Sequence, residues 1–85
     1  MEIVLLPTAI DDLQFWKQSG NTIILKRIRQ LFEAIQLSSY TGIGKPEALK
    51  YNLAGKWSRR INQEHRFIYK VEDDRITVYS LRYHY

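Results

Sequence analysis

The sequence contains no cysteine, only two prolines and four glycines, and no apolar run long enough to cross a membrane. The missing cysteines exclude a disulfide framework and any thiolate metal site, and they suit a reducing compartment. The first residues lack the basic segment and the longer apolar segment that are typical of a signal peptide. We therefore expect a soluble, cytoplasmic protein that does not associate with a membrane.

The chain of 85 residues has the length of one small domain, and its six Tyr, three Phe and two Trp are more aromatic residues than a disordered chain carries. No repeat, linker or shift in composition divides it, so we expect a single domain over residues 1–85. Charge, however, is uneven. Acidic and basic residues balance in residues 1–44, whereas residues 45–85 carry the whole net charge of +4. This asymmetry predicts that the second half binds a polyanionic partner.

The first half predicts a strand followed by two helices. Residues 3–6 are apolar enough for a strand inside a sheet, and Pro7 ends that strand. Thr8 is the expected N-cap of a helix of about three turns, and Asp11 and Asp12 lie in its first turn, where acidic groups suit the helix dipole.

A second helix is expected from the cap residue Asn21 to about Leu37. Its apolar residues recur with helical spacing and form one stripe, and only a few polar residues separate it from the first helix. The two helices should therefore form a hairpin. The stripe consists of Ile24, Ile28, Leu31, Phe32 and Ile35.

The second half predicts strands. After a loop that contains two glycines and a proline, the expected elements are a possible strand over 47–53, a strand over 57–61, a polar turn at 62–64, a central strand over 65–71 and a last strand over 76–83. The order is βααβββ, or βααββββ if residues 47–53 form a strand. The fold class is α+β, with two N-terminal helices packed on one face of a mostly antiparallel sheet.

A two-residue turn at Asp73 and Asp74 sets the pairing of the last two strands. In that register Phe67 faces Ser80 and Glu64 faces Tyr83, so the C-terminal tail lies beside the turn at 62–64. Strict alternation places His84 on the face opposite Arg66. A bulge or bend would be needed to bring these two side chains together.

The residue types around this turn suit one reaction. Cleavage of RNA by internal transfer needs a base for the 2′-OH, fixed positive charge for the phosphorane, and an acid for the departing 5′ oxygen. Residues 57–66 hold three arginines, a glutamate and a histidine, and the chain ends on Arg82-Tyr83-His84-Tyr85. Arginine holds phosphate with its planar fork. Carboxylates are few in the second half and two of them form a turn, so we expect no metal site and no cofactor.

These residues also resemble a known family, the YoeB (Txe) toxins of the RelE superfamily. The residues that carry the similarity are the block from Gly44 to Arg66, GKPEALKYNLAGKWSRRINQEHR, and the terminal RYHY. It covers nearly the whole chain and is strongest from Gly42 to Tyr85. Asp11-Asp12 followed by Trp16 extends it into the first helix. The resemblance implies a RelE-like fold and a ribosome-dependent mRNA interferase of a type II toxin–antitoxin pair, which cuts mRNA in the ribosomal A site. It also implies a YefM-like antitoxin, a toxin homodimer, and operator DNA binding by the toxin–antitoxin complex alone.

At matching positions the resemblance implies Glu47 as general base, Arg66 as phosphate clamp and His84 as general acid. It implies that the site is completed by Lys50, Arg60, Glu64 and Tyr85. We further assign phosphate contacts to Lys45, Lys56 and Arg59, on the basis of charge. The sequence departs from the family at Ala48, where proline is common, and at Tyr51, where histidine is common. Neither is an expected catalytic position.

Other interpretations stay open at this stage. A basic α+β module that binds RNA, or DNA together with its partner as a co-repressor, explains the charge equally well, although Glu47, Arg66 and His84 favour an enzyme. Arg59 shares one side of its strand with Trp57, so its stem alternatively covers the apolar face. His65 is more typical of a strand histidine with a structural hydrogen bond than of a ligand.

Overall fold

The computed structural model describes residues 1–83 and contains, in that range, two α-helices and a five-stranded sheet. The elements are β1 (Glu2–Leu5), α1 (Pro7–Gln18), α2 (Thr22–Leu37), β2 (Glu47–Ala48), β3 (Trp57–Arg60), β4 (Arg66–Glu72) and β5 (Arg75–Ser80), with a 3₁₀ turn at Tyr51–Leu53. The order is βααββββ, so the predicted α+β class is confirmed. Neither described helix has the length and apolar character that crossing a membrane requires.

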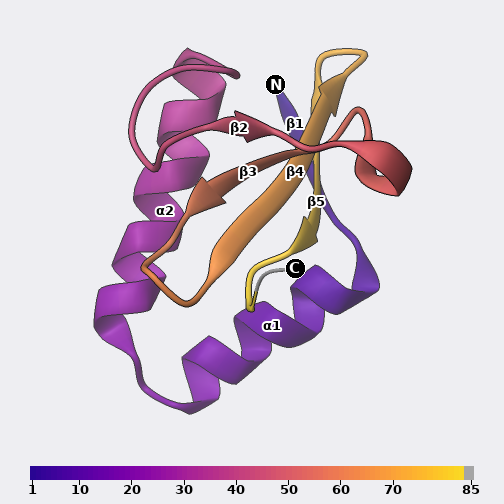
Figure 1. Cartoon of the computed structure of the whole chain (residues 1–85). Coiled ribbons are helices and arrows are strands. Elements are labelled where there is room, and N and C mark those ends of the chain that lie inside the picture. The colour runs from indigo at the N-terminus through magenta and orange to yellow at the C-terminus, as the bar shows by residue number, and fades with distance from the viewer. Residues whose placement is uncertain (84–85) are drawn as a thin grey trace.

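The strands lie in the order β1-β5-β4-β3-β2, with β1 parallel to β5 and all other neighbours antiparallel. The helices pack against one face of this sheet and leave the other face open (Figure 1). β4 is central, as predicted. The prediction that the first strand lies inside the sheet is wrong, because β1 pairs with β5 alone and forms an edge on which Ile3 is exposed.

The apolar stripe of α2 lies in the core as predicted, and the Asn21 side chain accepts a hydrogen bond from the Ile24 N–H at 3.1 Å. The start of α1 differs from the prediction. Pro7, not Thr8, opens the helix, since the fixed φ of proline suits the first helical position and its missing N–H costs nothing there. Asp12 is consequently not in the first turn but buried, and it accepts the Leu81 N–H at 2.9 Å.

The segment predicted as a strand over 47–53 is mostly not a strand. β2 has two residues, and the chain turns into the 3₁₀ segment at Tyr51, whose φ of 58° is incompatible with a strand. The edge strand β2 therefore ends at Ala48, and the 3₁₀ segment at Tyr51–Leu53 follows it.

A β-bulge shifts the pairing of β4 and β5. Tyr69 faces Val78, but Ile68 faces Ser80, so Tyr79 is the extra residue. The prediction that Phe67 faces Ser80 is therefore wrong by one residue. The tail nevertheless lies beside β4, because the Arg66 N–H donates to the Tyr83 carbonyl at 2.9 Å. The bulge removes the alternation argument that set His84 opposite Arg66, and His84 itself lies outside the described residues.

Candidate active site

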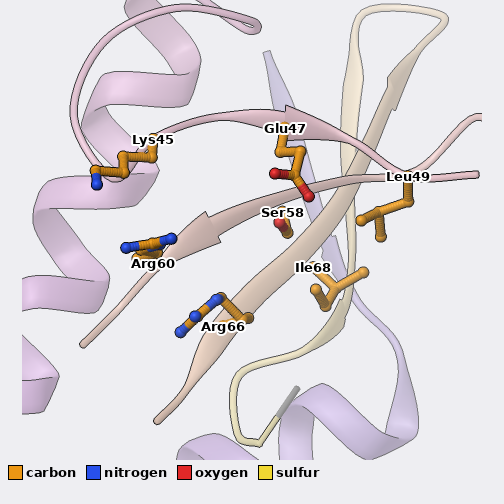
Figure 2. Close-up of a pocket in the computed structure, with 7 residues that line it drawn as sticks. All are labelled: Lys45, Glu47, Leu49, Ser58, Arg60, Arg66 and Ile68. Carbon is orange, nitrogen blue, oxygen red and sulfur yellow. The ribbon is translucent and has the colours of Figure 1, made fainter. Parts of the chain in front are cut away.

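A hollow of about 240 Å³ opens on the uncovered face of the sheet, where β2, β3 and β4 lie side by side. Its cationic side chains lie on one side and its apolar side chains on the other, with the Glu47 carboxylate between them (Figure 2). The hollow therefore combines an acid–base group with positive charge. Its lining consists of Lys45, Glu47, Leu49, Ser58, Arg60, Arg66 and Ile68.

Strand register brings these residues together. Glu47 on β2 faces Ser58 on β3, which in turn faces Ile68 on β4. One step of two residues along the strands, Arg60 faces Arg66. Because side chains alternate between the faces of a sheet, all five lie on the open face. The site is therefore formed by regular strands rather than by flexible loops.

The polar turn before β4 holds the Arg66 guanidinium. The Asn62 side chain accepts hydrogen bonds from the N–H groups of Glu64 at 2.9 Å and His65 at 2.7 Å, which fixes the turn. Arg66 Nη1 then donates to the carbonyls of Asn62 at 2.8 Å, Gln63 at 3.1 Å and His65 at 3.1 Å. Within residues 1–83, Nε and Nη2 of Arg66 make no hydrogen bond, so these donors are open to an anion.

Arg59 lies on the opposite side of the sheet and is fully buried. Its guanidinium donates to four acceptors: the carbonyls of Ser38 at 2.6 Å, Thr41 at 2.8 Å and Ile43 at 3.0 Å, and the Tyr69 hydroxyl at 3.1 Å. The prediction that Arg59 contacts phosphate is therefore wrong. Alternation turns it inward with Trp57, and there it fastens the loop that precedes Lys45 to the sheet.

The Tyr69 hydroxyl completes this clamp by donating to the Ser39 carbonyl at 2.7 Å. Burial raises the pKa of Tyr69 above its ordinary value, against the lowering effect of the Arg59 guanidinium. Tyr69 thus remains a neutral donor and acceptor at pH 7, as both of its hydrogen bonds require.

Gly44 lets the loop approach β3 closely. Its φ is 85°, and a Cβ at this position would lie 2.9 Å from Leu31 Cδ2 and 3.1 Å from Arg59 Cβ. The close approach allows the Gly44 carbonyl to accept the Arg60 N–H at 2.7 Å. The next residue, Lys45, is thereby placed at the rim of the hollow.

Of the other predicted residues, three lie outside this hollow. Lys50 lines a neighbouring hollow, and Lys56 Nζ lies 4.1 Å from the centre of the Tyr79 ring. Glu64 is exposed in the turn, and its Oε1 is 3.6 Å from His65 Nε2. Their roles in RNA binding stay predictions. Two further predicted residues, His84 and Tyr85, are outside the part of the chain that the structure describes.

His65 has the structural role that its sequence position suggested. It is buried, its ring meets the Trp16 ring edge-on at 4.8 Å, and Nδ1 accepts the Tyr83 N–H at 2.8 Å. Because Nδ1 accepts this hydrogen bond, a proton on the neutral ring lies on Nε2. His65 thus fixes the start of the C-terminal tail next to Arg66.

Sequence reasoning missed Ser58, Leu49 and Ile68 as lining residues. Two of them could have been predicted from strand alternation. Ser58 lies two residues before Arg60, and Ile68 lies two residues after Arg66, so each shares a face of its strand with that arginine. Leu49 could not be predicted as a lining residue, because the sequence does not show that β2 ends at Ala48.

The hollow can hold a phosphate and accept a proton. Lys45, Arg60 and Arg66 supply positive charge, and the Glu47 carboxylate is the group that can act as a base. Among residues 1–83, no three His, Asp or Glu side chains gather in a way that would hold a metal ion. The described residues of the hollow thus supply two of the three groups that transfer chemistry on RNA requires, the base and the fixed positive charge.

Comparison with known proteins finds similar sequences and similar structures over the whole chain. A family model described as "YoeB-like toxin of bacterial type II toxin-antitoxin system" matches residues 6–85. The curated relative "Toxin YoeB" of Escherichia coli (strain K12) is 40% identical over 85 residues, with 100% of both chains covered. Two solved structures from Staphylococcus aureus are similar over 100% of this chain and 98% of theirs. They are a YoeB dimer, with a TM-score of 0.92 and 42% identity, and a YoeB-YefM complex, with a TM-score of 0.91 and 43% identity.

Proposed function

Because the chain belongs to the YoeB-like toxin family of bacterial type II toxin–antitoxin systems, we propose that it is a ribosome-dependent endoribonuclease that cleaves mRNA in the A site. Cleavage of the translated message inhibits protein synthesis. The observation that carries the proposal is that the Glu47 carboxylate lines the same hollow as the cationic side chains of Arg60 and Arg66.

The proposed reaction begins at Glu47. Its carboxylate takes the proton of a 2′-OH, and the 2′ oxygen attacks the adjacent phosphorus. The P–O5′ bond breaks, which leaves a 2′,3′-cyclic phosphate on one fragment and a 5′-OH on the other. Arg66, together with Arg60 and Lys45, stabilises the charge that develops on the phosphorane oxygens.

The departing 5′ oxygen needs a proton, and we assign its donation to His84, with Tyr85 beside it. This assignment comes from the family resemblance. It is compatible with the position of Tyr83, whose carbonyl accepts the Arg66 N–H at 2.9 Å and so brings the start of the tail to the hollow. The proposed chemistry uses side chains throughout and needs no metal ion.

We also propose the partners that this function needs: the ribosome, a YefM-like antitoxin and a second copy of the chain. The antitoxin and the dimer are supported by the solved YoeB-YefM complex and YoeB dimer, which are 43% and 42% identical to this chain. Operator DNA is then bound by the toxin–antitoxin complex rather than by the toxin alone.

The test is cleavage of a defined mRNA in a translation extract by the wild type and by Glu47→Gln, Arg66→Ala and His84→Ala. Each change should slow cleavage by about a hundredfold or more, because each removes a proton-transfer group or a charge that stabilises the transition state. Matched controls are Glu72→Gln and Arg75→Ala, which change the same residue types outside the hollow and should leave the rate within about twofold.

The same variants separate this function from the co-repressor alternative. An endoribonuclease predicts that expression of the wild type arrests growth and cuts translated messages, and that Arg66→Ala relieves both effects. Growth arrest by the wild type and by all three variants, with messages intact, would instead support a binding module without catalysis.

A further inference from the structure

A second hollow, of about 540 Å³, lies directly beside the first and shares two of its walls, Glu47 and Leu49. It is formed by β2 and the segment that follows, which includes Ala48, Lys50, Tyr51 and Leu53. The proposed cleavage site does not use this space. A nucleotide next to the cleaved phosphate would nevertheless extend into the second hollow, because the two hollows adjoin at Glu47.

Tyr51 presents an unpacked aromatic ring at this hollow. It is 91% exposed, whereas the ring of Tyr69 in the core is fully buried. Its φ of 58° is unusual for a residue other than glycine and places it at the start of the 3₁₀ turn. An exposed tyrosine ring is a surface on which an unpaired RNA base stacks.

The backbone of Ala48 supplies a donor and an acceptor at the same place. The Leu49 N–H donates to the Lys56 carbonyl at 2.9 Å, so the Leu49 N–H points toward the side of β3. Neighbouring residues of an antiparallel strand direct their backbone groups to opposite sides. The N–H and C=O of Ala48 therefore point away from β3, toward the free edge of the sheet, since β2 is the last strand.

Together these groups match the chemistry of a nucleobase. A base has two flat apolar faces and an edge that carries hydrogen-bond donors and acceptors. Tyr51 can cover a face, the Ala48 backbone can pair with an edge, and Lys50, also exposed at this hollow, can contact the flanking phosphate. Within residues 1–83, no aromatic side chain lines the first hollow.

We propose that the second hollow binds the unpaired base of the nucleotide adjacent to the cleaved phosphate, with Tyr51 as the stacking residue and Ala48 as the backbone reader. This subsite gives the enzyme its base preference. The inference rests on the proposed function, since it names the part of the RNA that the same site recognises.

The test measures the cleavage rates of two sets of ribosome-bound mRNAs. Messages of the first set differ in the base at one A-site nucleotide, and those of the second set carry an abasic nucleotide at one A-site position each. On messages with all bases present, Tyr51→Ala should slow cleavage by about tenfold or more, which is the worth of one stacked base. Tyr51→Phe keeps the ring and should cleave within about twofold of the wild type. On the message whose abasic nucleotide would occupy the subsite, Tyr51→Ala and the wild type should cleave at equal rates.

Ala48→Pro tests the backbone contact separately. Proline is tolerated on edge strands, and here it removes the outward N–H without removing a hydrogen bond to β3. The ranking of the four bases at one nucleotide should therefore change. The control is Tyr40→Ala, which removes a 48%-exposed ring outside both hollows and should leave rates and ranking unchanged.

Two results would overturn the inference alone. One is loss of cleavage in Arg66→Ala while Tyr51→Ala cleaves every message as fast as the wild type. The other is a result that gives Tyr51 a different role. If Tyr51→Ala slows cleavage equally with and without each base, Tyr51 is a structural residue. If Tyr51→Ala weakens only antitoxin binding, Tyr51 is a protein contact. Wild-type protein that cleaves none of the messages would instead overturn the proposed function, and this subsite with it.

Discussion

Two neighbouring arginines show how the position of a residue decides its role. Arg59 and Arg60 are adjacent on β3, but alternation turns Arg59 into the core and Arg60 toward the open face. Arg59 makes four hydrogen bonds to loop carbonyls and to Tyr69, whereas Arg60 lines the hollow. The inward side of β3 was readable from the sequence, but the carbonyls that receive the buried charge come from a loop about twenty residues away, and no local pattern reports them.

The first prediction compares Arg59→Lys with Arg60→Lys. Lysine cannot reproduce the fork of donors, so Arg59→Lys should lower the free energy of unfolding by about 3 kcal/mol, because it leaves buried carbonyls unpaired. Arg60→Lys should change it by less than about 0.5 kcal/mol. Urea unfolding measures both, and equal stability of the two variants would show that the Arg59 clamp does not hold the loop.

At the scale of elements, helix α1 fixes the C-terminal tail. Asp12 accepts the Leu81 N–H at 2.9 Å, and Trp16 Nε1 donates to the Leu81 carbonyl at 2.9 Å. Both groups are buried, so one helix side holds both polar atoms of one tail residue. Two residues later the chain reaches Tyr83, beside Arg66. The helix therefore contributes to the site although it covers the other face of the sheet.

The second prediction compares Asp12→Ala with Asp11→Ala. Asp12→Ala leaves the buried Leu81 N–H without an acceptor, which should cost about 1–3 kcal/mol of unfolding free energy and speed amide exchange at Leu81. Asp11 is exposed, and Asp11→Ala should change stability by less than about 0.5 kcal/mol. Unchanged protection of the Leu81 amide in Asp12→Ala would contradict the role of α1.

Periodicity predicted both helices, the central strand and the turn at Asp73 and Asp74, because these depend on residues close in sequence. Periodicity failed where tertiary contacts determine strand register and strand length. The bulge opposite Ile68 shifts the tail by one residue, and the left-handed conformation of Tyr51 ends β2 early. Likewise, the choice of Thr8 as N-cap placed Asp11 and Asp12 in the first turn of α1, whereas the helix begins at Pro7 and Asp12 accepts the Leu81 N–H. For the site, the family block indicated Glu47, Arg60 and Arg66, but only strand register shows that they share one hollow.

Across the whole molecule, positive charge and the two helices lie in different parts of the chain. The excess positive charge lies in residues 45–85, whose described part supplies four of the five strands, whereas residues 1–44, which include both helices, carry no net charge. The helices cover one face of the sheet and leave the other open (Figure 1). A long-range field of this kind attracts a polyanion to one side of the protein. The fold therefore predicts that the ribosome is met by the uncovered face of the sheet.

The third prediction concerns salt. Affinity for programmed ribosomes should fall steeply between about 50 and about 200 mM salt, because each phosphate contact releases counterions. Lys45→Ala should reduce the slope of log affinity against log salt by about one contact, whereas Lys17→Ala, on α1, should leave it unchanged. A slope near zero for the wild type would contradict binding through the basic face.

The most direct test of the central claim, that Glu47 and Arg66 act together on one phosphodiester through its 2′-OH, is cleavage of a ribosome-bound mRNA with a single 2′-deoxy nucleotide at the cut position. The account predicts that the unmodified message yields a 2′,3′-cyclic phosphate and a 5′-OH, and that the 2′-deoxy message stays whole at that position. Glu47→Gln should cut the unmodified message at least about a hundredfold more slowly and leave the 2′-deoxy message whole. Cleavage of the 2′-deoxy message at the same position, or products that carry a 5′-phosphate, would contradict it.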